Sequence, residues 1–177
     1  MLEQYLQHIQ EGYLFSDKTI SVNLDSFLNG SNKKLLIVGV LGSGKTSLGS
    51  YLAKKYKVAF FSDESGMIKA LQSPQRMIIE GAQIASLYKM KPEVRKLILN
   101  QSMIIIGLSA IKAGLRADKR DSTLPGKAKN WKDIYYHSRE NLLYWQKAVK
   151  FFRRDVEKIS GFKIKEYKMP TFKAVFY

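Results

Sequence analysis

The stretch LLIVGVLGSGKTSLGSYLAKKY, residues 35–56, contains three local patterns in a row. It begins with a continuous apolar run, which is typical of a strand buried on both faces of a parallel sheet. A glycine-rich turn follows, and after Thr46 the apolar residues recur at helical spacing. The stretch therefore predicts a strand, a tight turn and a helix, which is the beginning of an α/β fold.

The turn matches the pattern G-x-x-x-x-G-K-[ST], which is typical of a phosphate-binding loop. Its glycines allow several backbone N–H groups to point at one phosphate, and the helix that follows adds its positive N-terminus. We expect Lys45 to contact the β and γ phosphates of a nucleotide and the Thr46 hydroxyl to bind Mg²⁺. The flanking strand and helix argue against a glycine-rich turn without a ligand. The predicted nucleotide contacts are Gly39, Leu41, Gly42, Ser43, Gly44, Lys45, Thr46 and Ser47.

Further apolar runs alternate with helical patterns along the chain. Strands are expected at 57–65, 76–82 and 102–108, with helical stretches at 66–72 and 83–100. Strands that alternate with helices imply right-handed crossovers and a parallel sheet covered on both faces. The prediction is a three-layer α/β/α fold of the P-loop NTPase, kinase type, with a mostly parallel sheet of about five strands.

The two ends of the chain have their own patterns. Residues 1–32 are interpreted as an N-terminal helix and a lead-in, and residues 33–177 as the main domain. A long helix is predicted at about 131–159, and 161–167 is a candidate last strand. One apolar stripe along the long helix predicts packing against the sheet. The stripe consists of Leu142, Trp145, Val149, Phe152, Val156 and Ile159.

The charge of the chain indicates a polyanionic partner. The 177 residues include 30 Lys and Arg against 15 Asp and Glu, which gives a net charge of +15. Residues 1–90 contribute +3, from 10 basic and 7 acidic side chains, and residues 91–177 contribute +12, from 20 and 8. A nucleic acid is therefore expected to meet mainly the second half of the chain.

Cysteine content and hydropathy bear on chemistry and location. The chain has no cysteine, which excludes disulfides and thiolate metal sites. No apolar run approaches the roughly 20 residues of a membrane span, and the N-terminus does not have the pattern of a signal peptide. We therefore expect a cytoplasmic protein, in the host cytoplasm if a phage encodes it, with no membrane and no protein partner implied.

From about Lys33 to Arg120 the chain resembles the P-loop kinases, a family that includes shikimate kinase, polynucleotide kinase and the zeta-toxin kinases. In this family an acidic residue follows the second strand, up to about twenty residues after the P-loop lysine. Here that residue is Asp63, eighteen residues after Lys45, and Glu64 is the competing choice. The resemblance implies that this carboxylate contacts the acceptor hydroxyl as a general base or orienting group.

Glu80 ends the apolar run MIIEGA. The resemblance implies that its carboxylate binds Mg²⁺ through water, or orders water near the acceptor. Many ATPases have Asp-Glu after this strand, whereas this chain has Glu-Gly, which favours a kinase over an ATPase. The alternative is a structural role, in which Glu80 pairs with Lys45 or an arginine.

The region near 109–130 is the candidate lid. Lys112, Arg116 and Arg120 are spaced four residues apart, and therefore lie on one face if the segment is helical. The lid arginines of P-loop kinases close on the triphosphate, which implies that Arg116 and Arg120 neutralise charge during transfer. A solvated basic face is the alternative.

A second basic stripe runs along the long helix and includes Lys147, Lys150 and Arg154. Together with the charge of the second half, it predicts a track for nucleic-acid phosphates. Here too the alternative is a solvated helix face.

These patterns predict an ATP- and Mg²⁺-dependent kinase with a nucleic-acid acceptor, DNA being favoured. The acceptor is a 5′-hydroxyl or a hydroxymethylated base; in type and size the chain is similar to the 5-hydroxymethyluracil DNA kinases of bacteriophages. A nucleotide or other small-molecule kinase is the main alternative, and a nucleic-acid-stimulated ATPase is another. The predicted catalytic residues are Lys45, Asp63, Arg116 and Arg120. The predicted substrate contacts are Asp63, Glu64, Glu80, Lys112, Lys147, Lys150 and Arg154.

Overall fold

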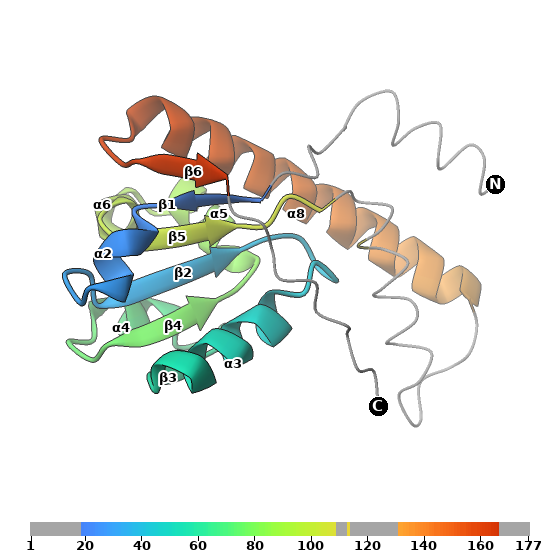
Figure 1. Ribbon diagram of the computed structural model, residues 1–177. Helices are drawn as coiled ribbons and strands as arrows, with labels where there is room; N and C mark the ends of the chain where they lie inside the picture. Colours follow the sequence, from blue (N-terminus) through green and yellow to red (C-terminus); the bar gives the residue numbers. More distant parts are fainter. Residues whose placement is uncertain (1–18, 109–112, 114–130, 167–177) are drawn as a thin grey trace.

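The computed structural model describes residues 19–108, Ala113 and 131–166. Within them, six strands form one sheet in the order β3-β4-β2-β5-β1-β6 (Figure 1). The strands are β1 (Ile20–Val22), β2 (Lys34–Val38), β3 (Ala59–Phe61), β4 (Met77–Glu80), β5 (Ser102–Ile105) and β6 (Ile164–Glu166).

The sheet is mixed, so the prediction of a mostly parallel sheet of about five strands is wrong. Strands β3, β4, β2 and β5 pair in parallel, but β1 pairs antiparallel with both β5 and β6. If β1 ran parallel to β2, the connection between them would need a crossover of roughly a dozen residues or more. Instead, the chain turns at one edge of the sheet through the short helix α2 (Leu24–Leu28). The three residues of β1 were too few to show a strand period in the sequence.

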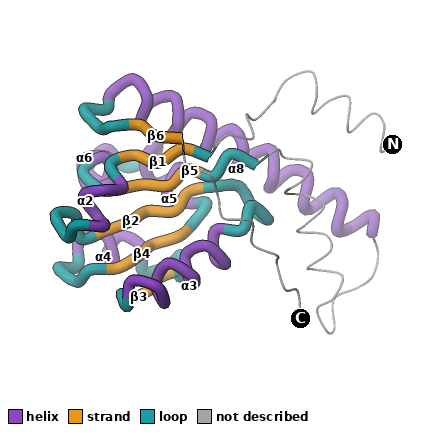
Figure 2. The backbone as a smooth tube through the Cα atoms, in the orientation of Figure 1, coloured by secondary structure: helices purple, strands orange, loops and turns teal. Residues whose placement is uncertain are grey.

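Helices cover both faces of the sheet, so the fold is α/β (Figures 1 and 2). Helices α2 and α3 pack on one face, and α4, α5, α6 and α8 pack on the other. Besides α2, the bounds are α3 (Lys45–Tyr56), α4 (Met67–Gln72), α5 (Gln83–Met90), α6 (Pro92–Leu99) and α8 (Trp131–Ile159).

Alternate residues of the central strand belong to two separate cores. Leu35 and Ile37 of β2 pack in the cluster that contains Leu48 of α3. Leu36 and Val38 pack in the cluster that contains Phe152 of α8. All of these side chains are at most 1 % exposed. The period of two in a strand therefore distributes one apolar run over both helical layers.

Each helix predicted within the described residues is present, and one of them is interrupted. The stretch 83–100 is two helices, because Pro92 starts α6 and Lys91 is extended, with φ −124°. The long helix 131–159 is confirmed, and Val149, Phe152 and Val156 of its stripe are buried. Ile159 is 58 % exposed because α8 ends there. The predicted N-terminal helix and almost all of the predicted lid lie outside the described residues.

The helices among the described residues include none that is long and apolar enough to cross a membrane.

Candidate active site

The phosphate-binding pattern forms the loop between the carboxyl end of β2 and the start of α3. Gly42 and Gly44 have φ of 74° and 89°, values that glycine adopts without steric strain. A Cβ at Gly39 would lie 2.6 Å from Ser43 Oγ and 3.2 Å from Cβ of Ile106. Glycine is therefore required at three positions of this loop, twice for conformation and once for space.

Two polar side chains are buried inside the loop. Lys45 is 7 % exposed, and its Nζ donates a hydrogen bond of 2.9 Å to the carbonyl oxygen of Val40. Ser43 is 1 % exposed, and its Oγ has no hydrogen-bond partner within the part of the chain that the structure describes. Because buried polar groups are normally hydrogen-bonded, this hydroxyl is a candidate ligand contact.

Thr46 and Glu80 meet at the base of the loop. Strand β4 lies beside β2, with Glu80 opposite Ile37, and the Gly81 N–H donates to the Ile37 carbonyl at 3.2 Å. This register brings the Thr46 hydroxyl to Oε1 of Glu80 at 2.9 Å. The two residues predicted to serve Mg²⁺ are 34 positions apart in the chain and lie in direct contact.

The pair fits a magnesium ion but does not by itself form a complete site. Mg²⁺ usually keeps several waters and takes one or two carboxylates together with substrate phosphates. The described residues contain no group of three or more His, Cys, Asp or Glu side chains that could hold a metal. An ion here would therefore need oxygens from the nucleotide and from water.

Asp63 follows β3 at the same edge of the sheet. Strand β3 is separated from β2 by β4, a spacing of about 10 Å between the outer two strands. Asp63 is exposed and accepts hydrogen bonds from the Ser65 backbone N–H at 3.0 Å and the Ser65 hydroxyl at 2.8 Å. These bonds hold the pKa of the Asp63 carboxyl below its ordinary value. Glu64, the competing choice, is also exposed.

The predicted basic residues lie apart from the loop or outside the described residues. Lys112, Arg116 and Arg120 belong to the undescribed part of the chain. Lys147, Lys150 and Arg154 are exposed on α8, in the helical layer opposite α3. The Arg154 guanidinium lies over the Phe151 ring, 5.0 Å from its centroid. The sheet therefore separates these α8 cations from α3, the helix that follows the loop.

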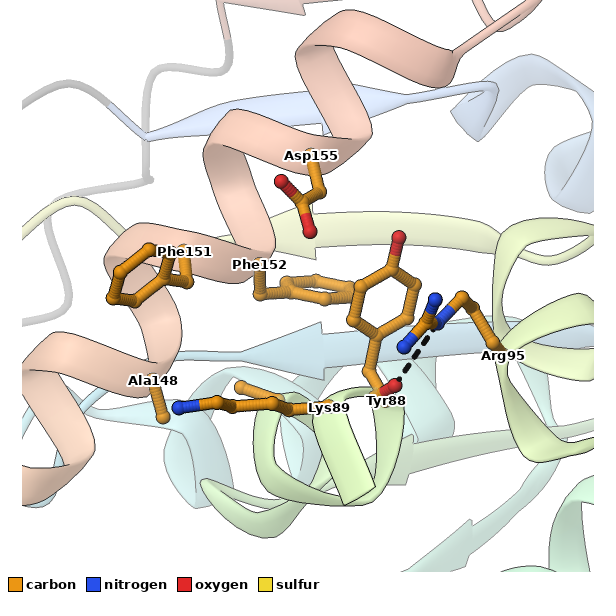
Figure 3. A pocket seen from close by; sticks show the side chains of 8 residues that line it. Tyr88, Lys89, Arg95, Ala148, Phe151, Phe152 and Asp155 are labelled. Carbon is orange, nitrogen blue, oxygen red and sulfur yellow. Dashed lines mark hydrogen bonds between the residues drawn. The ribbon is translucent and has the colours of Figure 1, made fainter. Parts of the chain in front are cut away.

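A pocket of about 120 Å³ lies between α5, α6 and α8 (Figure 3). The sequence did not identify it, because its residues come from three helices. One signal was present: Phe151 lies next to Phe152 but outside the apolar stripe, so its ring is not needed in the core. The lining residues are Ala85, Tyr88, Lys89, Arg95, Ala148, Phe151, Phe152 and Asp155.

Comparison with known proteins adds no family assignment. No family model, no curated protein and no solved structure matches this chain. The functional argument therefore depends on the geometry described above.

Proposed function

We propose that this protein is an ATP- and Mg²⁺-dependent kinase that transfers the γ-phosphate to a hydroxyl of a nucleic acid. The observation that carries the proposal is the 2.9 Å hydrogen bond between Thr46 and Glu80 beneath a glycine-rich loop. A hydroxyl and a carboxylate are oxygen ligands of the kind that Mg²⁺ takes in proteins, so Thr46 and Glu80 would be able to hold the ion. A glycine-rich turn with only a structural role has no need of that pair.

The donor half of the reaction uses the loop. Backbone N–H groups of residues 39–46 and the N-terminus of α3 would surround the phosphates. The Lys45 ammonium would exchange the Val40 carbonyl for oxygens of the β and γ phosphates, and the Ser43 hydroxyl would gain a partner. Thr46 and Glu80 would hold Mg²⁺ directly or through water. The ion would neutralise negative charge on the phosphate oxygens during transfer.

In the transfer step, the acceptor oxygen forms a bond to the γ-phosphorus as the bond to the β–γ bridging oxygen breaks, so ADP leaves. The acceptor hydroxyl loses one proton. Asp63 would accept a hydrogen bond from that hydroxyl and orient it, and the proton would pass to solvent. A carboxyl with a lowered pKa is a weak base, which favours orientation over strong proton abstraction. Positioning and charge stabilisation provide most of the catalysis in such transfers.

The acceptor class follows from charge. The +12 of residues 91–177 favours a polyanionic acceptor over a small molecule. A hydroxymethylated base or a 5′-hydroxyl end meets this condition, and DNA is favoured.

The test is to incubate the protein with γ-labelled ATP and Mg²⁺, offering hydroxymethyluracil DNA, 5′-hydroxyl DNA, 5′-hydroxyl RNA or mononucleotides in separate reactions. We expect label on a nucleic acid. Label on mononucleotides alone would contradict a nucleic-acid acceptor. Free phosphate in every reaction would indicate an ATPase.

Variants separate binding from transfer. Lys45→Ala should abolish transfer by weakening triphosphate contacts. Asp63→Asn should leave ATP binding intact and lower the transfer rate, because a neutral amide orients the acceptor hydroxyl less strongly than a carboxylate does. Lys54→Ala, at an exposed position in the last turn of α3, is the control and should retain activity. Full activity of Asp63→Asn would move the orienting role to another residue.

A further inference from the structure

The surface of α5 and α8 exposes aromatic rings and cations together. Phe151 is 47 % exposed and Tyr144 is 53 % exposed, both on α8. The Nζ of Lys89 lies 5.5 Å from the centroid of the Phe151 ring, and the guanidinium of Arg154 lies 5.0 Å from it. Aromatic rings interleaved with cations are typical of surfaces that bind single-stranded nucleic acid, where bases stack and phosphates pair.

The pocket described above opens beside Phe151. Tyr88 and Phe152 form its inner wall, with their ring centroids 5.1 Å apart in an edge-to-face arrangement. Figure 3 shows Phe151 and Lys89 on one side of the pocket, and Tyr88 and Arg95 on the other. The Arg95 guanidinium lies over the Tyr88 ring at 5.1 Å. The pocket therefore offers flat apolar walls with positive charge on two sides.

Two polar groups of the pocket are suited to the edge of a base. Tyr88 is 3 % exposed, and its hydroxyl has no hydrogen-bond partner among the described residues. Burial raises the pKa of this phenol, and the nearby Asp155 raises it further while Arg95 opposes the shift, so the hydroxyl stays protonated and can donate. The carboxylate of Asp155, also in the lining, can accept a hydrogen bond from a base N–H group.

From these observations we infer that the α5–α8 surface, defined as Tyr88, Lys89, Tyr144, Phe151, Arg154 and Asp155, binds single-stranded nucleic acid. One unstacked base enters the pocket beside Phe151, and Lys89 and Arg154 contact the flanking phosphates. A duplex fits less well, because its bases are stacked and its rings are not available to Phe151. The inference rests on the proposed function only for the acceptor class, since it gives that acceptor a binding surface.

The location of this surface separates strand binding from phosphate transfer. Helix α8 extends past the edge of the sheet where the phosphate-binding loop lies (Figure 1). A strand held along α8 can therefore continue toward the loop, while its anchoring contacts lie in the other helical layer.

The experiment measures the anisotropy of a labelled 12-nucleotide single strand with the full chain, without ATP or Mg²⁺. Phe151→Ala should weaken binding about tenfold, because one stacking platform is lost. Lys89→Gln and Tyr88→Phe should each weaken it about threefold. Circular dichroism and the urea unfolding midpoint would establish that each variant is folded.

Helix α3 provides a matched control on the opposite layer. Lys55 lies over the ring of Tyr51 at 6.0 Å, and Tyr51 is 44 % exposed. Tyr51→Ala and Lys55→Gln likewise remove a ring and a cation from an exposed pair, and should alter binding by less than about twofold. Equal losses on both layers would overturn the inference, because binding would then depend on net charge alone.

Other outcomes are equally decisive. The inference would be overturned if a duplex bound as tightly as the single strand and Phe151→Ala had no effect on either. It would also be overturned if an acidic peptide displaced the labelled strand and Phe151→Ala bound the strand as tightly as the unmodified protein does. Because no nucleotide is added, loss of strand binding is distinguishable from failure of the kinase proposal. That proposal fails separately if Lys45→Ala leaves phosphate transfer unchanged.

Discussion

The glycine-rich loop with its Thr46–Glu80 pair and the α5–α8 surface are built in opposite ways. Residues 39–44 place Lys45 and Thr46 at the start of α3, and the neighbouring strand β4 places Glu80 beside them. The α5–α8 surface is assembled from two helices, with α6 completing the pocket beside it, and its rings reach their positions only through packing. The first site can be recognised from a sequence pattern, while the second depends on the core beneath it. Substitutions at the loop should therefore change its chemistry directly, whereas substitutions in the core should change the α5–α8 surface through the packing of its helices.

Phe152→Ala should have the largest effect on stability. The ring is 1 % exposed and belongs to the core between α8 and the sheet. It also lines the pocket. Its removal should lower the free energy of unfolding by about 3–5 kcal/mol, measured by urea denaturation. The neighbouring Phe151→Ala is the control, because its ring is half exposed, and it should cost less than about 0.5 kcal/mol. Equal losses for the two variants would contradict the division into a core ring and a surface ring.

Glu80→Gln should lower phosphate transfer and leave strand binding at the α5–α8 surface unchanged. Glutamine keeps the size of the side chain and an oxygen that can accept from Thr46, but it removes the negative charge that favours Mg²⁺. We expect phosphate transfer to fall by about 100-fold, on the scale of losing one charge-stabilising group, with unchanged single-strand binding. Glu157→Gln on α8, which removes an exposed ion pair with Arg153, is the control. Normal Mg²⁺-dependent transfer by Glu80→Gln would remove Glu80 from the metal site.

Arg154→Gln should change the salt dependence of strand binding. Each phosphate contact to a single strand contributes about 0.7 to the slope of log affinity against log salt concentration. The variant should lower that slope by about this amount and leave ATP binding unchanged. Lys54→Gln on α3 should keep the original slope. A slope that stays the same in Arg154→Gln would place the phosphate contacts on other residues.

Ser65→Ala should have the smallest effect, on the pKa of Asp63. The Ser65 N–H and hydroxyl both stabilise the ionised carboxylate, so the folded-state pKa lies below 3.8. This contribution to stability is present above pH 3.8 and is lost as the pH falls through the folded-state pKa. Removal of the hydroxyl should raise the pKa toward the ordinary value and shift the acid limb of the transfer rate upward. Carboxyl NMR titration of Asp63 measures the shift, and an unchanged pKa would assign the effect to the backbone N–H alone.

The sequence predicted the elements that have a strong local signal. The apolar run of β2, the glycines of the loop and the stripe of α8 each have a period or a pattern that their own residues specify. The same reasoning failed for β1, which is three residues long, and for the break at Lys91, where Pro92 interrupts an otherwise continuous helical pattern. Short elements gain their stability from neighbours, so their own residues predict them poorly.

By itself, the sequence determined the α/β class, the glycine-rich turn between a buried strand and a helix, and the positive charge of the second half. The tertiary structure alone decided that β1 and β6 make the sheet mixed, that Thr46 contacts Glu80, and that Phe151 lines a pocket. The physical reason is the range of the interactions involved. Backbone conformation and apolar period act over a few residues, whereas strand order and helix packing depend on contacts between segments that are far apart in the chain.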